Sequence, residues 1–369
     1  MSIRKKEAIL RIMGSIWLIV ALAVLSFMTA HIKPASAAPT SINLSYAWFQ
    51  PPIGSNADAI KWWVSEVEKR TQGAVTIKVY WGGTLAKTGE IPEAVRKGTA
   101  DIGDTVWGTA FPEQFGLYSI VDWPIPFQRK NLACWVAIEK LAKEFPEFGQ
   151  MDAASNVRRL TYYGVDNIHV ACRKPISKIE DFKGLKIRCS GGNHSTLLEA
   201  VGSTTSYVPM AQAYDLLQKG VADGSTSGVF WMRWFKLAEI AKNLTRISMG
   251  GSPSTGAMIN LDVWNKLPQS VQRVLLDLRE EYPLYVAKLQ QEEAKVCYKY
   301  LEEMKVKIVD LPASDIETWK NLPSVKNLSE DWMKHMLKHT KVSESRLREM
   351  LKRYTELYTE YSKQYPLEW

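Results

Sequence analysis

Arg188 is the side chain in this sequence with the clearest capacity for ligand chemistry. It ends the segment Leu185–Arg188, in which apolar and basic residues alternate as in a short strand, before the small residues of Cys189–Gly192. Ligands of open α/β sheets bind beyond the carboxyl ends of strands, where a guanidinium offers a planar fork that matches a carboxylate. We predict that Arg188 anchors an anionic ligand. The alternative is a surface arginine paired with a neighbouring acid.

Catalytic and metal-binding motifs are not evident in the chain. The motifs GxSxG, HExxH, GxxxxGKS/T and GxGxxG do not occur. His335 and His339 have the four-residue spacing of metal ligands on a helix, but their surroundings are rich in lysine and offer no third ligand. We interpret them as an exposed helical pair. The sequence therefore favours a binding protein over an enzyme, with no cofactor and no metal.

The segment around Arg188 reads as strand, helix, strand, helix, strand from Phe182 to Gly228. The same alternation opens the chain. We expect strands at 41–48, 75–81 and 100–104, and helices at 57–71 and 91–97, the first of them capped by Asn56 or Ser55. Strands that alternate with helices indicate a parallel sheet. The sequence therefore predicts two α/β regions.

The later part of the chain predicts further elements that connect these regions. We expect strands at 160–165, 169–172, 258–260 and 306–311, and an aromatic-rich helix that begins at Phe230. A long helical segment runs from Leu267 to Met304, and Pro283 within it should kink it or split it in two. Two or more amphipathic helices follow and extend to Pro366.

The first residues of the chain resemble a secretory signal. A basic segment with Arg4, Lys5, Lys6 and Arg11 precedes an apolar run, and Ala35-Ser36-Ala37 forms an A-x-A cleavage site. The apolar run is long, so an uncleaved membrane anchor is the alternative. The leader contributes +4 of the formal net charge of +8, which leaves about +4 for the mature chain and no basic stripe typical of nucleic-acid binding.

The cysteines leave one question open. The chain has Cys134, Cys172, Cys189 and Cys297, and their spacing matches no metal motif. Export permits a disulfide without requiring one. Cys172 and Cys189 flank a short segment, so they either pair or remain buried free thiols.

The motifs from Gly184 onward resemble the substrate-binding proteins of TRAP transporters, the DctP-type family. The family pattern is similar to G-L-K-x-R, a helix, a strand leading to P-x-x-E-x-Y, and then A-L-Q-x-G-x-x-D-G-x-E-N. The matching residues are Gly184, Leu185, Lys186, Arg188, Pro209, Tyr214, Leu217, Gln218, Gly220, Asp223 and Gly224. Gln212 stands where the family usually has glutamate, and Ser227 where it usually has asparagine. The resemblance extends from about Asn43 to Asp310.

The resemblance implies an α/β, two-domain periplasmic binding protein fold with a hinge and a long domain-spanning helix. We expect the following divisions: residues 1–37 as signal peptide, 38–165 as a first α/β domain to which later strands return, 166–260 as a second α/β domain, 261–311 as the hinge-spanning helix and a returning strand, and 312–369 as C-terminal helices. We expect a monomer in the periplasm.

The resemblance also implies where the ligand is held. Arg188 would supply the charge, and Ser227 would give a shorter hydrogen-bonding side chain than the family's asparagine. The segments that face the cleft in the family contain the remaining candidates, which are Met210, Trp231, Trp48 and Trp107. Sialic-acid-type members have a second arginine at a position that corresponds here to Asn167 or Ile168.

The resemblance implies a protein that captures an organic acid by domain closure and delivers it to membrane permease subunits. The alternatives are a sensing protein that presents its closed form to a receptor and a periplasmic enzyme on a similar fold. Few side chains remain to bind ligand hydroxyl groups, while tryptophan is concentrated near the expected strand ends. We therefore predict a monocarboxylate with an apolar or aromatic body, in preference to a sugar acid or a C4-dicarboxylate.

Overall fold

The structure, a computed structural model, describes residues 41–122, 125–127, 130–189, 191, 193–250 and 255–366. The expected signal peptide lies outside the described residues. The chain divides into a short first unit, Met1–Ile42, and a large second unit, Asn43–Trp369, and the architecture below is that of the second unit.

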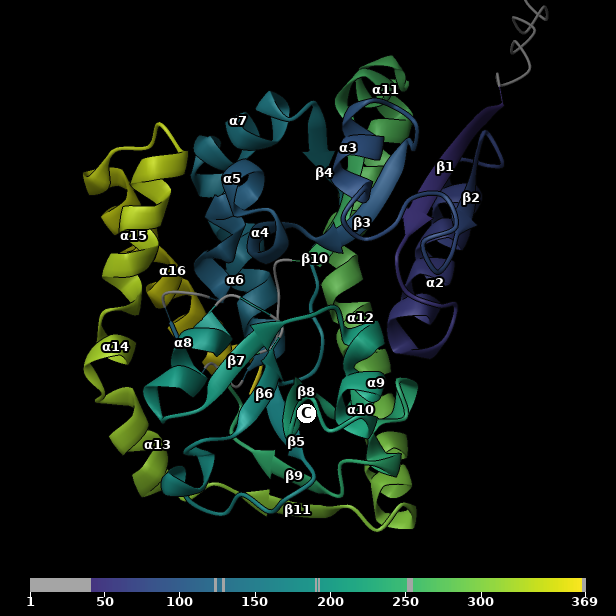
Figure 1. Cartoon of the computed structure of the whole chain (residues 1–369). Coiled ribbons are helices and arrows are strands. Elements are labelled where there is room, and N and C mark those ends of the chain that lie inside the picture. The colour runs from purple at the N-terminus through teal and green to yellow at the C-terminus, as the bar shows by residue number, and fades with distance from the viewer. Residues whose placement is uncertain are drawn as a thin grey trace, which may run out of the picture. The chain divides into compact units, whose positions relative to one another are not determined.

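The first sheet has the strand order β2-β1-β3-β10-β4 (Figure 1). Its strands are β1 (Ile42–Trp48), β2 (Val75–Tyr80), β3 (Ile102–Val106), β4 (Val157–Arg159) and β10 (Thr255–Asn260). Strand β1 pairs with β3 in parallel, with Trp48 opposite Asp104. Strand β10 comes from much later in the chain and runs antiparallel to both of its neighbours.

The second sheet has the order β11-β9-β5-β8-β6-β7. Its strands are β5 (His169–Cys172), β6 (Lys186–Cys189), β7 (Thr204–Tyr207), β8 (Gly224–Ser227), β9 (Asn243–Arg246) and β11 (Lys307–Asp310). Strand β6 is parallel to β7 on one side and to β8 on the other. The carboxyl ends of these three strands therefore lie at one edge of the sheet. This arrangement confirms the predicted alternation of strands and helices from Phe182 to Gly228.

The helices follow the predicted pattern. Their bounds are α2 (Gly54–Arg70), α3 (Ile91–Arg96), α4 (Trp107–Ala110), α5 (Pro112–Phe115), α6 (Asn131–Glu144), α7 (Pro146–Ala154), α8 (Asn193–Ala200), α9 (Ala213–Gln218), α10 (Val229–Trp234), α11 (Leu261–Lys266), α12 (Gln269–Glu303), α13 (Ala313–Lys320), α14 (Pro323–Lys326), α15 (Leu328–His339) and α16 (Glu344–Gln364). Short 3-10 helices occupy Gly116–Val121, Ile179–Phe182, Met210–Gln212 and Leu237–Glu239.

The chain passes between the two sheets several times. It crosses from β4 to β5 through residues 160–168, returns from β9 to β10, and crosses again along α12, which leads to β11. The strand expected at 160–165 is wrong: β4 ends at Arg159, and the following segment has one isolated bridge, between Tyr163 and Thr255. This segment leaves one sheet for the other, so its backbone has little opportunity for continuous pairing.

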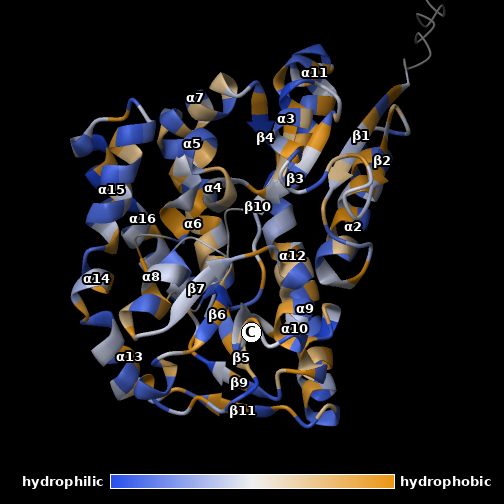
Figure 2. Cartoon of the chain, in the orientation of Figure 1, coloured by the Kyte–Doolittle hydropathy of each residue, from blue (hydrophilic) through white to orange (hydrophobic). Residues whose placement is uncertain are grey.

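Each sheet has its own hydrophobic core. The first core includes Trp107, Tyr118 and Trp332, and the second includes Ile187, Leu197 and Trp319. The C-terminal helices contribute to both, because α13 and α14 pack on the second core while α15 and α16 pack on the first. Blue and orange residues accordingly mix along α15 and α16 in Figure 2, as expected for amphipathic helices.

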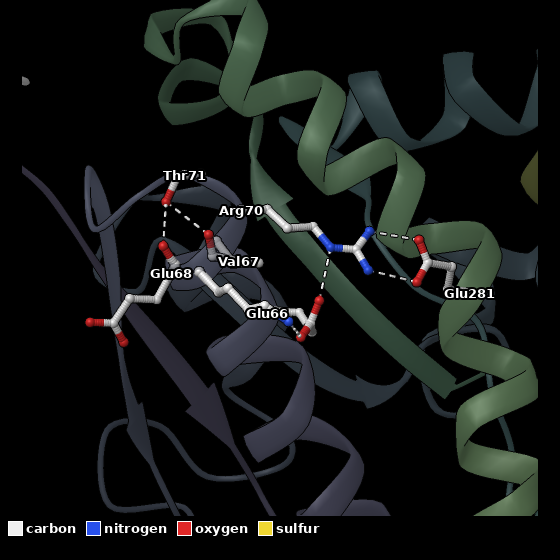
Figure 3. A network of polar contacts seen from close by, with 7 residues as sticks. Glu66, Val67, Glu68, Arg70, Thr71 and Glu281 are labelled. Carbon is white, nitrogen blue, oxygen red and sulfur yellow. Dashed lines mark hydrogen bonds and ion pairs between the residues drawn. The ribbon is translucent and has the colours of Figure 1, made fainter.

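Helix α12 is continuous over 35 residues although Pro283 lies inside it, so it is not split in two. It lies along α2. Arg70 donates to both oxygens of Glu281 at 2.6 and 2.7 Å, and its Nε donates to Glu66 at 2.9 Å (Figure 3). The predicted cap of α2 is wrong, because the N-cap position is Ile53 and neither Ser55 nor Asn56 caps the helix through its side chain.

Candidate functional site

The candidate site is the edge of the second sheet at which β6, β7 and β8 end. Arg188 is the third of four residues in β6, opposite Ser206 of β7 and Ser225 of β8. Its side chain is 3% exposed. The sequence predicted this position, because the strand had to end at the small residues that follow Cys189.

Backbone carbonyl groups hold the Arg188 guanidinium in place. Its Nε donates to the carbonyl of Val208 at 2.6 Å, and one terminal nitrogen donates to the carbonyl of Thr226 at 3.3 Å. The same terminal nitrogen lies 4.0 Å from the Met210 sulfur. Val208 follows β7, and Thr226 lies in β8. Arg188 is thus oriented by neighbours on both sides, and the alternative of an exposed surface arginine is wrong.

The Arg188 guanidinium carries its charge at neutral pH in spite of its burial. Burial lowers its pKa to about 10, because the charged form has lost its hydration. His194, in the first turn of α8, is 5% exposed, and its pKa falls to about 4 through burial and the nearby charge of Arg188. The imidazole is therefore neutral at pH 7. A charged guanidinium in this position suits a carboxylate.

Ser227 and the residues before β5 lie beside this strand edge. Ser227 pairs with His169 across β8 and β5, is fully buried, and its hydroxyl donates to the carbonyl of Gly228 at 2.9 Å. Asn167 and Ile168 are both buried at the end of the crossing segment. The backbone N–H of Ile168 donates to the carbonyl of Gly250, and the carbonyl of Ile168 accepts from the N–H of Met249, in the segment that follows β9.

Trp231 is half-buried in α10, which begins two residues after Ser227, and it packs against the second core. Asp166 positions this helix. One of its carboxylate oxygens accepts from the backbone N–H of Phe230 at 3.1 Å, and burial raises the pKa of Asp166 to about 7. A Cβ atom on Gly228 would lie 2.1 Å from the same carboxylate, so this position requires glycine.

Trp48 and Trp107 lie at the corresponding edge of the first sheet, and both are fully buried. Trp48 lies against Trp81, with ring centroids 5.1 Å apart. The Trp107 indole N–H donates to the carbonyl of Gly256 at 2.5 Å, and its ring meets Phe115 edge-on. The contacts of the described residues connect neither tryptophan with Arg188. Their role at the site stays a prediction.

Two buried residues were missed by the sequence reasoning, namely His194, which lies near Arg188, and Asp166, which holds the first turn of α10. Asp166 is an acid within an apolar crossing segment, and a buried lone acid of this kind signals a specific backbone partner. His194 follows Arg188 by six residues and begins a helix, but histidines were considered there only as metal ligands. Both side chains meet these partners through tertiary packing.

Other chemistry receives no support from the part of the chain that the structure describes. No group of three His, Cys, Asp or Glu side chains among those residues is arranged to hold a metal ion. His335 and His339 lie close together on α15, with ring centroids 4.5 Å apart. All four cysteines are buried free thiols, so Cys172 and Cys189 do not form a disulfide in this structure.

Two sheets, connected by crossing segments and one spanning helix, form the two-domain fold of a periplasmic binding protein. The family model described as bacterial extracellular solute-binding protein, family 7 (DctP), matches residues 49–336. The chain belongs to this family. The resemblance and the fold class inferred from the sequence are therefore confirmed.

Relatives and solved structures agree with this assignment. The C4-dicarboxylate-binding periplasmic protein DctP of Rhodobacter capsulatus is 26% identical over 301 residues, which cover 78% of this chain and 86% of that protein. A solute-binding protein of Albidiferax ferrireducens is 24% identical over 275 residues, 70% of this chain and 76% of that protein.

Among solved structures, a TRAP periplasmic solute-binding protein from Desulfovibrio salexigens is 27% identical, with a TM-score of 0.73 over 87% of this chain and 97% of that one. Two others share the fold. A Bordetella bronchiseptica protein with bound (R)- and (S)-mandelate is 22% identical, with a TM-score of 0.73 over 87% of this chain and 99% of that one. A marine metagenome protein in complex with 3-hydroxybenzoate is 21% identical, with a TM-score of 0.75 over 87% of this chain and 99% of that one.

The family assignment makes this chain a TRAP-type extracytoplasmic solute-binding protein. Members of the family are binding proteins of transporters and act in the periplasm. None of the described helices combines the length and the apolar character required to cross a membrane.

Proposed function

We propose that this protein captures a monocarboxylate with an apolar or aromatic body and delivers it to the membrane permease subunits of a TRAP transporter. The observation that carries the proposal is Arg188, a guanidinium that is charged, 3% exposed and held by two backbone carbonyls at the end of a central strand. A buried guanidinium with this orientation is suited to a carboxylate, because its planar fork matches the two carboxylate oxygens.

The surroundings of Arg188 support an apolar ligand body. Met210 lies beside the guanidinium, and Trp231 is half-buried on the next helix. The hydroxyl of Ser227 donates to the carbonyl of Gly228, so its proton is already used and cannot be donated to a ligand hydroxyl group. Two proteins of the same fold bind mandelate and 3-hydroxybenzoate, which are aromatic acids, whereas the Rhodobacter capsulatus relative binds C4-dicarboxylates.

The remaining site residues enter the proposal with less direct support. We propose that Ser227, Met210, Trp231 and Asn167 surround the ligand from the second sheet. Trp48 and Trp107 would border it from the first sheet. In this proposal the ligand binds between the sheets, and the protein acts as a periplasmic monomer whose two domains, divided near residue 165, close upon the ligand.

A thermal-shift screen followed by titration calorimetry tests the ligand class. The screen compares benzoate, (R)-mandelate, 4-methyl-2-oxopentanoate, succinate and a sugar acid. Benzyl alcohol is the matched control, because it keeps the aromatic body of benzoate and lacks the carboxylate. We expect one of the first three acids to bind and benzyl alcohol to have no effect. A ligand at 100 times its Kd stabilises the protein by about 2.7 kcal/mol.

Two outcomes would contradict the proposal. Tight binding of the sugar acid alone would show that the site satisfies several ligand hydroxyl groups. Tight binding of succinate alone would show that a second cationic group reaches the ligand and that the class is the C4-dicarboxylates.

A further inference from the structure

Glu293 of α12 joins elements that belong to the two different sheets. Its two carboxylate oxygens have different partners. One oxygen accepts from the backbone N–H of Ser55, in the first turn of α2, at 2.6 Å, and the other accepts from the indole N–H of Trp234, at the end of α10, at 2.8 Å. The second oxygen also lies 3.5 Å from a terminal nitrogen of Arg233, the residue before Trp234 in α10. The Glu293 side chain is 10% exposed, so these hydrogen bonds are largely shielded from water.

Helix α2 belongs with the first sheet and with the preceding part of α12. Trp63 of α2 packs edge-on against Tyr46 of β1, with ring centroids 6.2 Å apart. Along α12, the ring of Trp62 stacks on Tyr285 at 4.0 Å. The Arg70–Glu281 ion pair of Figure 3 fixes the other end of α2 to the same helix. Helix α2 and the Glu281–Glu293 part of α12 therefore form one packed block.

Helix α10 belongs with the second sheet. It follows β8 directly, and its first turn is held by Asp166. Trp234 stacks on Phe230, with ring centroids 5.5 Å apart. Its indole ring also lies against the backbone of Gly54, where an added Cβ atom would come within 2.3 Å of the ring. The end of α10 therefore contacts the start of α2, and Glu293 lies at this contact.

We infer that Glu293 is a latch, which holds the block of α2 to Trp234 of α10 and so keeps the two sheets in the arrangement of this structure. The first turn of α2 contains no acidic residue and has no side-chain cap, so Glu293 supplies the carboxylate that a helix N-terminus favours. Loss of the Glu293 carboxylate would leave the backbone N–H of Ser55 and the indole N–H of Trp234 without this acceptor. This inference goes beyond the proposed function, because it concerns the arrangement of the sheets and not the ligand.

Two substitutions separate the latch from general packing. Glu293→Gln keeps the shape of the side chain but has one acceptor oxygen, so it cannot serve both donors. Trp234→Phe keeps an aromatic ring against Gly54 and removes the indole N–H. Glu292→Gln is the matched control, because Glu292 is 66% exposed and pairs only with Lys295 among the described residues.

The distance between the sheets can be measured by electron–electron double resonance without any ligand. Spin labels are placed by Lys266→Cys on α11, which packs on β10 and β4, and by Lys174→Cys after β5. Both lysines are exposed, and the four native thiols are buried and react poorly. Thermal unfolding of each variant checks that the fold is retained.

We expect a narrow distance distribution for the parent and for Glu292→Gln. Glu293→Gln, which also removes the ion pair with Arg233, and Trp234→Phe, which keeps it, should each add a second, longer distance. The loss of one hydrogen bond to a charged group raises the ratio of the open to the closed arrangement about tenfold or more. If both variants fold and keep the parent distribution, Glu293 is a local helix cap and not a latch. Because no ligand is used, this result is separate from the outcome of the ligand screen.

Discussion

Substitution of Arg188 should remove ligand binding while the protein still folds. Burial lowers the Arg188 pKa to about 10, well below the usual value of a guanidinium, which means that charge burial costs the ligand-free fold about 3 kcal/mol. The hydrogen bonds to Val208 and Thr226 act in the opposite direction, at roughly 1.5 to 3 kcal/mol each. The two effects are similar in size. Arg188→Gln should therefore lower the free energy of unfolding by no more than about 3 kcal/mol.

The effect on binding should be much larger. Arg188→Lys keeps the charge but loses the planar fork and one charged hydrogen bond, so we expect a Kd increase of roughly 10- to 100-fold. Arg188→Gln also removes the charge. A ligand carboxylate without its buried partner costs roughly 3 kcal/mol or more, which corresponds to a Kd increase above about 100-fold.

The assay is titration calorimetry with the acid that binds most tightly in the screen, together with thermal unfolding. For a chain of this size the parent should gain roughly 4 °C in Tm at 100 times Kd, and Arg188→Gln should gain nothing. Arg173→Lys is the control, because Arg173 is 39% exposed and lies 3.6 Å from its partner Asp223. If Arg188→Lys binds as tightly as the parent, Arg188 is structural and the assignment of the site is wrong.

Two further substitutions test the buried acids. Gly228→Ala places a Cβ atom 2.1 Å from Asp166, so we expect a loss of about 1 to 3 kcal/mol in the free energy of unfolding by urea. Gly149→Ala is the control, because no atom lies within 4 Å of the added Cβ atom at that position. Equal effects of the two substitutions would contradict the packing argument. Burial raises the pKa of Asp104 from 3.8 to about 7, so the folded protein binds a proton that the unfolded chain has released, and the resulting stability is lost as the pH rises through 7. Asparagine does not titrate, so the free energy of unfolding of Asp104→Asn, relative to that of the parent, should rise by about 2 to 3 kcal/mol from pH 5 to pH 8. Thermal unfolding of both proteins at the two pH values measures this difference. If the difference is the same at both pH values, this interpretation is wrong.

Much of the fold could be predicted because its signals are local. The strand before Arg188, the helices after it and the long helix to Glu303 are each visible as a period of two or 3.6 residues. The position of Arg188 at a strand end followed from the small residues beyond it. The crossing segment at 160–168 could not be assigned correctly, because its apolar residues resemble a strand, whereas in the fold it passes between the sheets and makes isolated backbone pairings in place of a continuous strand.

The candidate site likewise combines a feature that the sequence predicts with contacts that only the fold creates. The sequence by itself determined that a guanidinium stands at a strand end in an α/β protein, since residue type and period are properties of the chain. Only the tertiary structure decided that Val208 and Thr226 orient this guanidinium, that Trp107 lies in the first core, and that Glu293 joins α2 to α10. These contacts link residues that are 20 to 238 positions apart. Contacts of this kind depend on how sheets and helices pack in space, and no local pattern of residues specifies them.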